Sequence, residues 1–409
     1  MRCLRRHSPQ CLSMMKTNKD NKSFNADIIS SSEEKGIYIH IPFCVKKCIY
    51  CDFVSYPDCS DEVRRDYFDA LKREAGLAAE QGRADSVFIG GGTPSLARAE
   101  DIAGVISCLQ LKPGAEITIE CNPGALDRRK LEIYRKAGIN RISLGVQSFY
   151  DSELKFLGRI HSREQAFEAV EMVRAAGFDN INLDLIFGFP GQTAESWEMS
   201  LKTALSLTPE HLSFYSLQIE EGTPLYEMFR KDVVDQISDD VNRTMYHRAL
   251  KMLGQTGYSH YEISNAALPG KECRHNLKYW SLKPYIGLGA AAHSFYRGYR
   301  YSNPQDISDY CRAVERKVSE GSLMSGTDFE KCSRESLEGD YIFTGLRLTE
   351  GMDTEEYERL FYDNFCSLYG RQIRELTDQG LVEMSGKRLK LTEKGLDLSN
   401  YVISEFLNL

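Results

Sequence analysis

Three cysteines, Cys44, Cys48 and Cys51, stand close together in the segment H-I-P-F-C-V-K-K-C-I-Y-C-D-F. A structural zinc ion usually takes four ligands from two separated pairs, but here three cysteines share one segment and Cys59 is a poorly spaced fourth ligand. A disulfide would leave one of the three thiols over. On a four-iron cluster, three thiolates leave one iron open for chemistry. We therefore interpret the spacing C-x3-C-x2-C as the ligand set of a [4Fe–4S] cluster.

Further residues that could bind a ligand or take part in chemistry follow or interrupt other apolar runs. The segment G-G-G-T-P at 90–94 lets a backbone approach a ligand closely, although a tight turn between a strand and a helix also uses glycines. Glu120 ends one run, and a carboxylate at the carboxyl end of a parallel strand points toward the site region. Asp184 lies inside another run, where an acid is costly unless it is paired or bound to a ligand. An ordinary buried salt bridge is the alternative interpretation for Asp184 and Arg159.

These residues need secondary-structure elements that bring them together. Short apolar runs bounded by Gly, Pro, Asn or Asp are typical of buried parallel strands, and they cover 37–41, 86–90, 116–121, 141–146, 180–187 and 211–217. Helices are expected between them over 62–80, 127–137, 162–176 and 193–207. Strand–helix units in series predict an α/β fold with a parallel sheet, either open or closed into a barrel. The cysteine segment follows the first strand, where such folds place their sites.

The alternation stops near position 263, so we expect a core domain over 36–263 and a connecting region over 264–332. A small C-terminal domain over 333–409 follows. Its expected elements are helices over 355–365 and 370–379, a hairpin of 381–384 with 388–392, and a last helix over 393–406. Helices followed by a two-stranded wing resemble a winged-helix module. We interpret it as a structural or partner-binding element, because fold alone does not give function.

The composition restricts the classes of function. The chain has 409 residues and a formal net charge of -8, and an acidic chain is a poor partner for nucleic acid. Its twelve cysteines are scattered, which indicates a reducing compartment and not a secreted disulfide scaffold. No apolar run reaches the roughly 20 residues that a transmembrane helix needs. We therefore expect a cytoplasmic protein without a transmembrane segment.

The first 35 residues are polar, and their first acid is Asp20. That scarcity of acids resembles an organellar transit peptide, which would make the location mitochondrial. The segment has no clear amphipathic apolar face, so a disordered extension is the simpler interpretation.

The cysteine motif, together with Y-I-H-I-P-F-C at 38–44, resembles the radical S-adenosylmethionine (SAM) superfamily. Within it, the chain is similar to the HemN/HemW group of oxygen-independent coproporphyrinogen III dehydrogenases and haem chaperones, from Ile37 to Leu409. The resemblance implies a partial (β/α)6 barrel of the TIM type with a C-terminal α+β winged-helix-like domain. It also implies that SAM binds the open iron of the cluster. The residues that it implies as SAM contacts are Tyr38, Tyr50, Gly91, Gly92, Thr93, Glu120, Gln147, Arg159 and Asp184.

Two features distinguish the activities of this group. In the dehydrogenases the cysteine motif continues to a fourth cysteine, and Phe53 stands at that position here. The segment H-N-L-K-Y-W at 275–280 resembles the HNxxYW motif of the haem chaperones, in which His275 would ligate haem iron, with His293 a weaker candidate. The resemblance therefore favours a haem chaperone of the HemW type. A coproporphyrinogen III dehydrogenase, which decarboxylates propionates by radical oxidation, is the alternative.

The resemblance also implies partners. A haem chaperone delivers haem to apoproteins, among which respiratory haem proteins are expected, and this role allows a peripheral membrane contact. The cluster implies an electron donor such as flavodoxin or ferredoxin.

Overall fold

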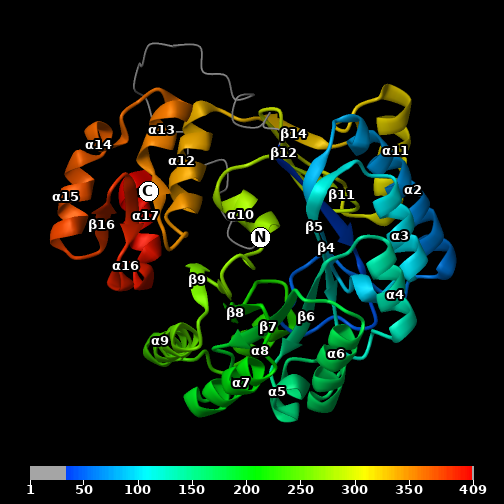
Figure 1. The fold of residues 1–409 in the computed structure, drawn as a ribbon, viewed down its shortest axis with the longest axis horizontal. Coiled ribbons are helices and arrows are strands. Elements are labelled where there is room, and N and C mark those ends of the chain that lie inside the picture. The colour runs from blue at the N-terminus through cyan, green and yellow to red at the C-terminus, as the bar shows by residue number, and fades with distance from the viewer. Residues whose placement is uncertain (1–33, 408–409) are drawn as a thin grey trace.

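The computed structural model describes residues 34–407, so the expectations for the N-terminal extension lie outside the described residues except at its very end. A twelve-stranded sheet forms the centre, and its six middle strands are parallel and follow chain order. They are β1 (Lys35–Ile41), β4 (Ala84–Gly91), β5 (Leu111–Cys121), β6 (Arg141–Gln147), β7 (Ile181–Phe187) and β8 (His211–Ser216). They follow one another around an incomplete barrel (Figure 1). The predicted parallel α/β fold is confirmed.

Helices cover the outer face of this sheet (Figure 1). They are α2 (Asp61–Glu80), α3 (Ala99–Ser107), α4 (Arg128–Lys136), α5 (Asp151–Phe156), α6 (Arg163–Ala175) and α7 (Ala194–Ser206). Both α6 and α7 begin with capping boxes, in which Ser162 and Thr193 accept from the backbone three residues on. These caps fix where each helix starts, and hence the length of the loop that precedes it.

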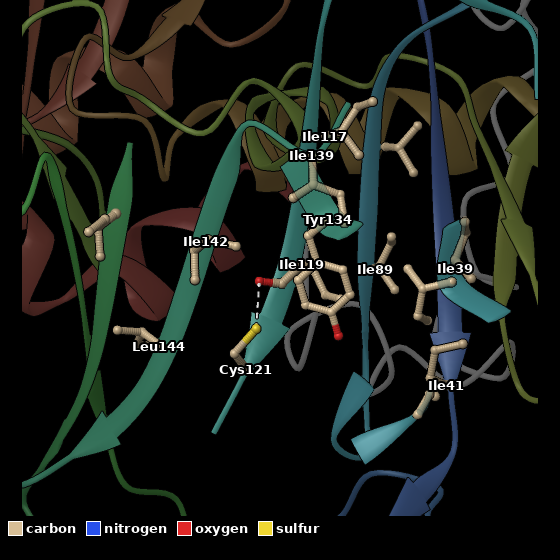
Figure 2. Packing of buried hydrophobic residues seen from close by; sticks show 14 of the residues in the cluster. Ile39, Ile41, Ile89, Ile117, Ile119, Cys121, Tyr134, Ile139, Ile142 and Leu144 are labelled. Carbon is tan, nitrogen blue, oxygen red and sulfur yellow. Dashed lines mark hydrogen bonds between the residues drawn. The ribbon is translucent and has the colours of Figure 1, made fainter. Parts of the chain in front are cut away.

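The two faces of the strands differ in chemistry, because successive side chains of a strand point to opposite faces. The outward set is apolar and belongs to the main core cluster. Figure 2 shows Ile39, Ile89 and Ile119 on neighbouring strands, with Tyr134 of α4 next to Ile119. Full burial of such a side chain contributes about 1.5–3 kcal/mol. The inward set is polar. Ser143 donates to Asp184 at 3.0 Å, for example. The barrel interior is therefore suited to polar ligands.

The sheet extends beyond the predicted strands at both edges. One edge adds β11 (Tyr285–Leu288), β12 (His293–Tyr296), β13 (Tyr299–Ser302) and β14 (Asp328–Lys331), and the other adds β10 (Asn265–Ala267) and β9 (Ser259–Glu262). The region also contains α10 (Arg274–Trp280) and α11 (Ile307–Glu320), and α8 (Pro224–Arg230) and α9 (Asp239–Gln255) precede it. Strands of three or four residues are too short to show a period, so they could not be predicted from the sequence. The domain boundaries at 263 and 332 stay a prediction.

The C-terminal part has its own apolar core. Its helices are α12 (Arg334–Gly345), α13 (Thr354–Phe361), α14 (Phe365–Leu368), α15 (Gly370–Asp378), α16 (Glu393–Asp397) and α17 (Ser399–Leu407), around a sheet of β15 (Met352–Asp353), β17 (Arg388–Leu391) and β16 (Val382–Ser385). The predicted hairpin is present as β16 and β17. The first predicted helix ends earlier than expected, because Tyr362 has a left-handed φ of 58°. The last predicted helix is interrupted at Leu398.

Between residues 34 and 407, none of the helices combines the length and the apolar character that a membrane crossing requires.

Candidate functional site

The three cysteines lie in the loop between β1 and α2. Cys44 is buried in the short strand β2 (Phe43–Cys44), which pairs with β3 (Tyr56–Pro57), while Cys48 and Cys51 are half-buried. A backbone hydrogen bond of 3.2 Å from Cys51 N to Cys48 O tightens the loop. Burial raises the pKa of the Cys51 thiol to about 11, so bound metal is needed to hold it as a thiolate.

The donor chemistry of this loop, three thiols, suits a four-iron cluster. Among residues 34–407, no three His, Cys, Asp or Glu side chains converge as ligands of one metal ion. A four-iron cluster has a different requirement, because each thiolate binds a different iron and the sulfurs need not meet at one point. The structure thus brings the predicted cysteines to one loop with their thiols free.

The glycines at the end of β4 lie directly against this loop. A Cβ atom at Gly92 would come within 2.7 Å of Phe43 O and 2.9 Å of Cys44 Sγ. Gly91 has a φ of 122°, which side chains rarely adopt, and its N–H donates to Glu120 Oε2 at 3.2 Å. The G-G-G-T-P segment is therefore both a tight turn and the contact between β4 and the cysteine loop.

Two carboxyl groups share the barrel interior behind these glycines. Burial, followed by the charge of Asp184, raises the pKa of Glu120 to about 8, and burial also raises the pKa of Asp184. Asn182 and Ser143 donate to Asp184 at 2.8 and 3.0 Å. Gln147 ends β6 with a φ of 68° at a bulge in its pairing with β7. The predicted residues from β5, β6 and β7 therefore face one interior. Asp184 is hydrogen-bonded to the neutral groups of Asn182 and Ser143, and within residues 34–407 it forms no salt bridge.

Glu120 should make stability depend on pH. Its pKa is about 8 in the folded chain and about 4.5 without burial, so the folded chain holds an extra proton between those values and loses stability as pH rises through them. Glu120→Gln can still accept from Gly91 but does not titrate. We therefore expect the midpoint temperature of thermal unfolding, measured on the metal-free proteins, to fall less in the variant than in the wild type between about pH 5 and about pH 8. Parallel pH curves for the two proteins would contradict this pKa.

Arg159 reaches the cysteine loop from the segment between α5 and α6. Its Nη1 donates to Cys48 Sγ at 3.7 Å, and its Nη2 donates to Gly145 O at 2.7 Å. Its Nε is buried and has no hydrogen-bond partner among residues 34–407. Tyr50 lies beside the guanidinium, whereas Tyr38 is in the barrel interior and hydrogen-bonds His40 at 3.0 Å. The unsatisfied donor of Arg159 is suited to an anionic group of a ligand.

Open space adjoins these groups. A pocket of about 170 Å³ borders the loop, and a second of about 380 Å³ borders the segment after α5. The first pocket is lined in part by Cys48, Thr93, Asn122, Arg159 and Gln165. Asn122 was not identified from the sequence, although its place directly after the E-C end of β5, at the edge that carries the site, is a signal for it.

His275 lies at the opposite end of the barrel, in α10, and is fully buried. Its Nδ1 is 3.0 Å from Ser86 Oγ and its Nε2 is 2.9 Å from Tyr279 OH, so both ring nitrogens are engaged. Burial lowers the pKa of His275 to about 3, so the ring is neutral at ordinary pH. The other candidate, His293, is exposed at the start of β12. The structure therefore does not place His275 beside the cysteine loop.

A buried ion pair supports the far side of β1. Lys317 of α11 contacts Glu74 of α2 at 2.5 Å, and both side chains are fully buried. Glu74 also accepts from Gly289 N, at 2.8 Å, at the end of β11. On the same helix, Tyr67 donates to His40 O at 2.6 Å, just before the cysteine loop begins. The position of the loop thus depends on α2.

Comparison with known proteins agrees with this geometry. Residues 38–204 match the radical SAM superfamily, and residues 340–398 match the HemN C-terminal domain. The fold and the three-cysteine loop define a radical SAM protein.

The family follows from relatives that match along nearly their whole length. The heme chaperone HemW of Bacillus subtilis is 37% identical over 91% of this chain and 99% of its own length, and HemW of Lactococcus lactis is 36% identical over 90% and 96%. The structure of coproporphyrinogen III oxidase (HemN) from Escherichia coli has a TM-score of 0.78 at 24% identity, covering 93% of this chain and 92% of its own, which shows a shared fold. The chain belongs to the HemW family.

Proposed function

We propose that this protein is a haem chaperone that binds a [4Fe–4S] cluster, SAM and haem and delivers haem to apoproteins. The observation that carries the proposal is the match to HemW relatives over 90–91% of the chain, cysteine loop included. Phe53, in place of a fourth cysteine, agrees with this choice over a coproporphyrinogen III dehydrogenase.

Cys44, Cys48 and Cys51 hold the cluster, which supplies an open iron and an electron when bound. The SAM-binding residues lie in the barrel interior, at the carboxyl ends of β4, β5 and β6, and in the loops that carry Tyr50 and Arg159. Backbone around Gly91, Gly92 and Thr93 allows close approach, and Arg159 offers a donor to a carboxylate. Polar contacts in the barrel interior come from Tyr38, Glu120, Gln147 and Asp184, and Tyr50 adds a contact beside Arg159.

Haem binding by His275 needs a change of conformation. A ring nitrogen must give up its contact with Ser86 or Tyr279 before it can bind iron, and α10 must move out of the barrel end that it fills. The neutral imidazole retains the lone pair that a haem ligand needs.

Haem titration of the anaerobically reconstituted protein tests this assignment. We expect a Soret band in the wild type and a clearly weaker band in His275→Ala, because the variant lacks the ligating nitrogen. His293→Ala is the matched control and should bind haem like the wild type. Equal haem binding by all three proteins would remove His275 from the ligand set but leave the chaperone function in place.

The chaperone function has its own test. Haem-loaded protein should pass haem to an apoprotein, and the shift of the Soret band measures this transfer. In a separate incubation with SAM and reductant, coproporphyrinogen III should remain unchanged. Formation of protoporphyrinogen in that incubation would establish the dehydrogenase alternative.

Partners follow from the same proposal. Haem acceptors such as respiratory haem proteins receive the haem, and this role allows a peripheral membrane contact. Exposed Lys46 and Lys47 beside Cys48 suit an acidic electron donor such as flavodoxin or ferredoxin. A cytoplasmic location stays a prediction, as does the mitochondrial alternative, because a leader would fall in residues outside the described range.

A further inference from the structure

Three side chains from three different segments connect two of the cluster cysteines. Arg159 donates through Nη1 to Cys48 Sγ at 3.7 Å and through Nη2 to Asn122 Oδ1 at 2.6 Å. Asn122 Nδ2 then donates to Thr93 Oγ1 at 3.1 Å. The Thr93 hydroxyl oxygen lies 3.7 Å from Cys44 Sγ. Hydrogen-bonding contacts therefore run without a gap from one sulfur to the other.

The protons of this network have a single arrangement once both cysteines are thiolates. A guanidinium only donates, so the oxygen of Asn122 must face Arg159 and its NH2 group must face Thr93. Thr93 Oγ1 accepts from that NH2 group, and its own proton is then left for Cys44. Each of the two sulfurs consequently receives one hydrogen bond, and the charge of Arg159 sets the direction of all of them.

The backbone holds each member of the network in place. Thr93 N donates to Phe43 O at 2.8 Å, and Asn122 N donates to Ser95 Oγ at 3.2 Å. Arg159 Nη2 also donates to Gly145 O. Because Asn122 hydrogen-bonds both Arg159 and Thr93, it determines whether the two ends of the network act together.

We propose that Asn122 is a positioning residue for the [4Fe–4S] cluster, which aligns Arg159 and Thr93 as donors to the thiolates of Cys48 and Cys44 and so raises the reduction potential. This inference rests on the proposed cluster binding. Reduction adds negative charge to the cluster, so hydrogen bonds to its sulfur ligands stabilise the reduced form more than the oxidised form.

Asn122→Asp keeps the shape of the side chain but replaces the donor toward Thr93 with an acceptor. The new carboxylate takes the Thr93 proton away from Cys44 and brings negative charge near the cluster. In a redox titration of the reconstituted full-length protein, followed by electron paramagnetic resonance without SAM, we expect the equilibrium constant for reduction to fall at least about tenfold, which is about 59 mV for one electron. Thr93→Val should shift the potential in the same direction by less, because it loses only the bond to Cys44.

Gln165→Ala is the matched control, since Gln165 lines the same pocket without joining the network, and its potential should equal that of the wild type. Iron content should stay the same in all variants. Unchanged potentials in Asn122→Asp and Thr93→Val with full iron content would overturn the proposal. If Asn122→Asp failed to retain iron, Thr93→Val would decide alone, and an unaltered potential there would overturn it. A wild type that binds no iron would instead refute the proposed cluster.

Discussion

Replacing Cys48 with alanine should remove nearly all iron from the protein. The wild type, reconstituted without oxygen, should carry about four irons and as many sulfides per chain. Without the Cys48 thiolate, one iron loses its protein ligand, and the two remaining thiolates of the loop hold the cluster too weakly for it to survive desalting. Cys48 is also the sulfur that Arg159 contacts, at 3.7 Å, so the variant leaves that guanidinium without this partner. Iron and acid-labile sulfide assays measure the loss directly.

Cys59→Ala is the informative control for this experiment. Cys59 is half-buried just before α2, eight residues after Cys51, and is the candidate for the fourth ligand of a four-thiolate zinc site. We expect Cys59→Ala to keep its full iron content. Loss of metal from Cys59→Ala, zinc in place of iron, or a stoichiometry near two irons would each contradict the three-cysteine cluster.

Replacing Glu74 with leucine should cause a large loss of stability, although Glu74 lies outside the site. The change leaves the Lys317 ammonium fully buried without its counter-charge, and it removes the acceptor for Gly289 N, Asn303 and Tyr310. Breaking a buried pair in this way costs about 3–5 kcal/mol. Urea unfolding of the metal-free protein should therefore show a lower midpoint. The cysteine loop should also loosen, because α2 holds the end of β1 through Tyr67.

Two comparisons isolate the buried charge as the cause. Adding Lys317→Met to Glu74→Leu should restore part of the stability, because no unpaired charge then remains inside. Glu383→Ala breaks the pair with Lys390 on the exposed hairpin of the C-terminal part, and it should cost about 0–1 kcal/mol. If the single and double variants at Glu74 unfolded at the same midpoint, the lost hydrogen bonds and not the charge would be responsible.

The repeating part of the fold could be read from the sequence because its signal is local. Runs such as 141–146 and 180–187 are apolar and end in turn residues, and they appear as β6 and β7 within one residue of the expected bounds. β11 could not be found in this way. It is four residues long and is a strand because β1 offers it a parallel partner, which is a contact between distant segments.

The site, too, has one part that could be predicted from local sequence and one part that depends on contacts between distant segments. The [4Fe–4S] loop could be predicted from a contiguous motif, because the spacing of its three cysteines is typical of cluster ligands. The path from Cys48 through Arg159, Asn122 and Thr93 to Cys44 joins four segments, and no spacing in the sequence shows that Asn122 stands in the middle of it.

The sequence by itself determined the cofactor chemistry and the alternating α/β plan, because both depend on residue types at short separations. Only the tertiary structure decided which polar groups meet in the barrel and which of them hydrogen-bond one another. His275 is the clearest case. Its motif predicts an iron ligand, whereas the packing of α10 against β4 buries the ring, and both of its nitrogens have hydrogen-bond partners. Burial and hydrogen-bond partners arise from segments far apart in the chain, so they become visible only when the chain is folded.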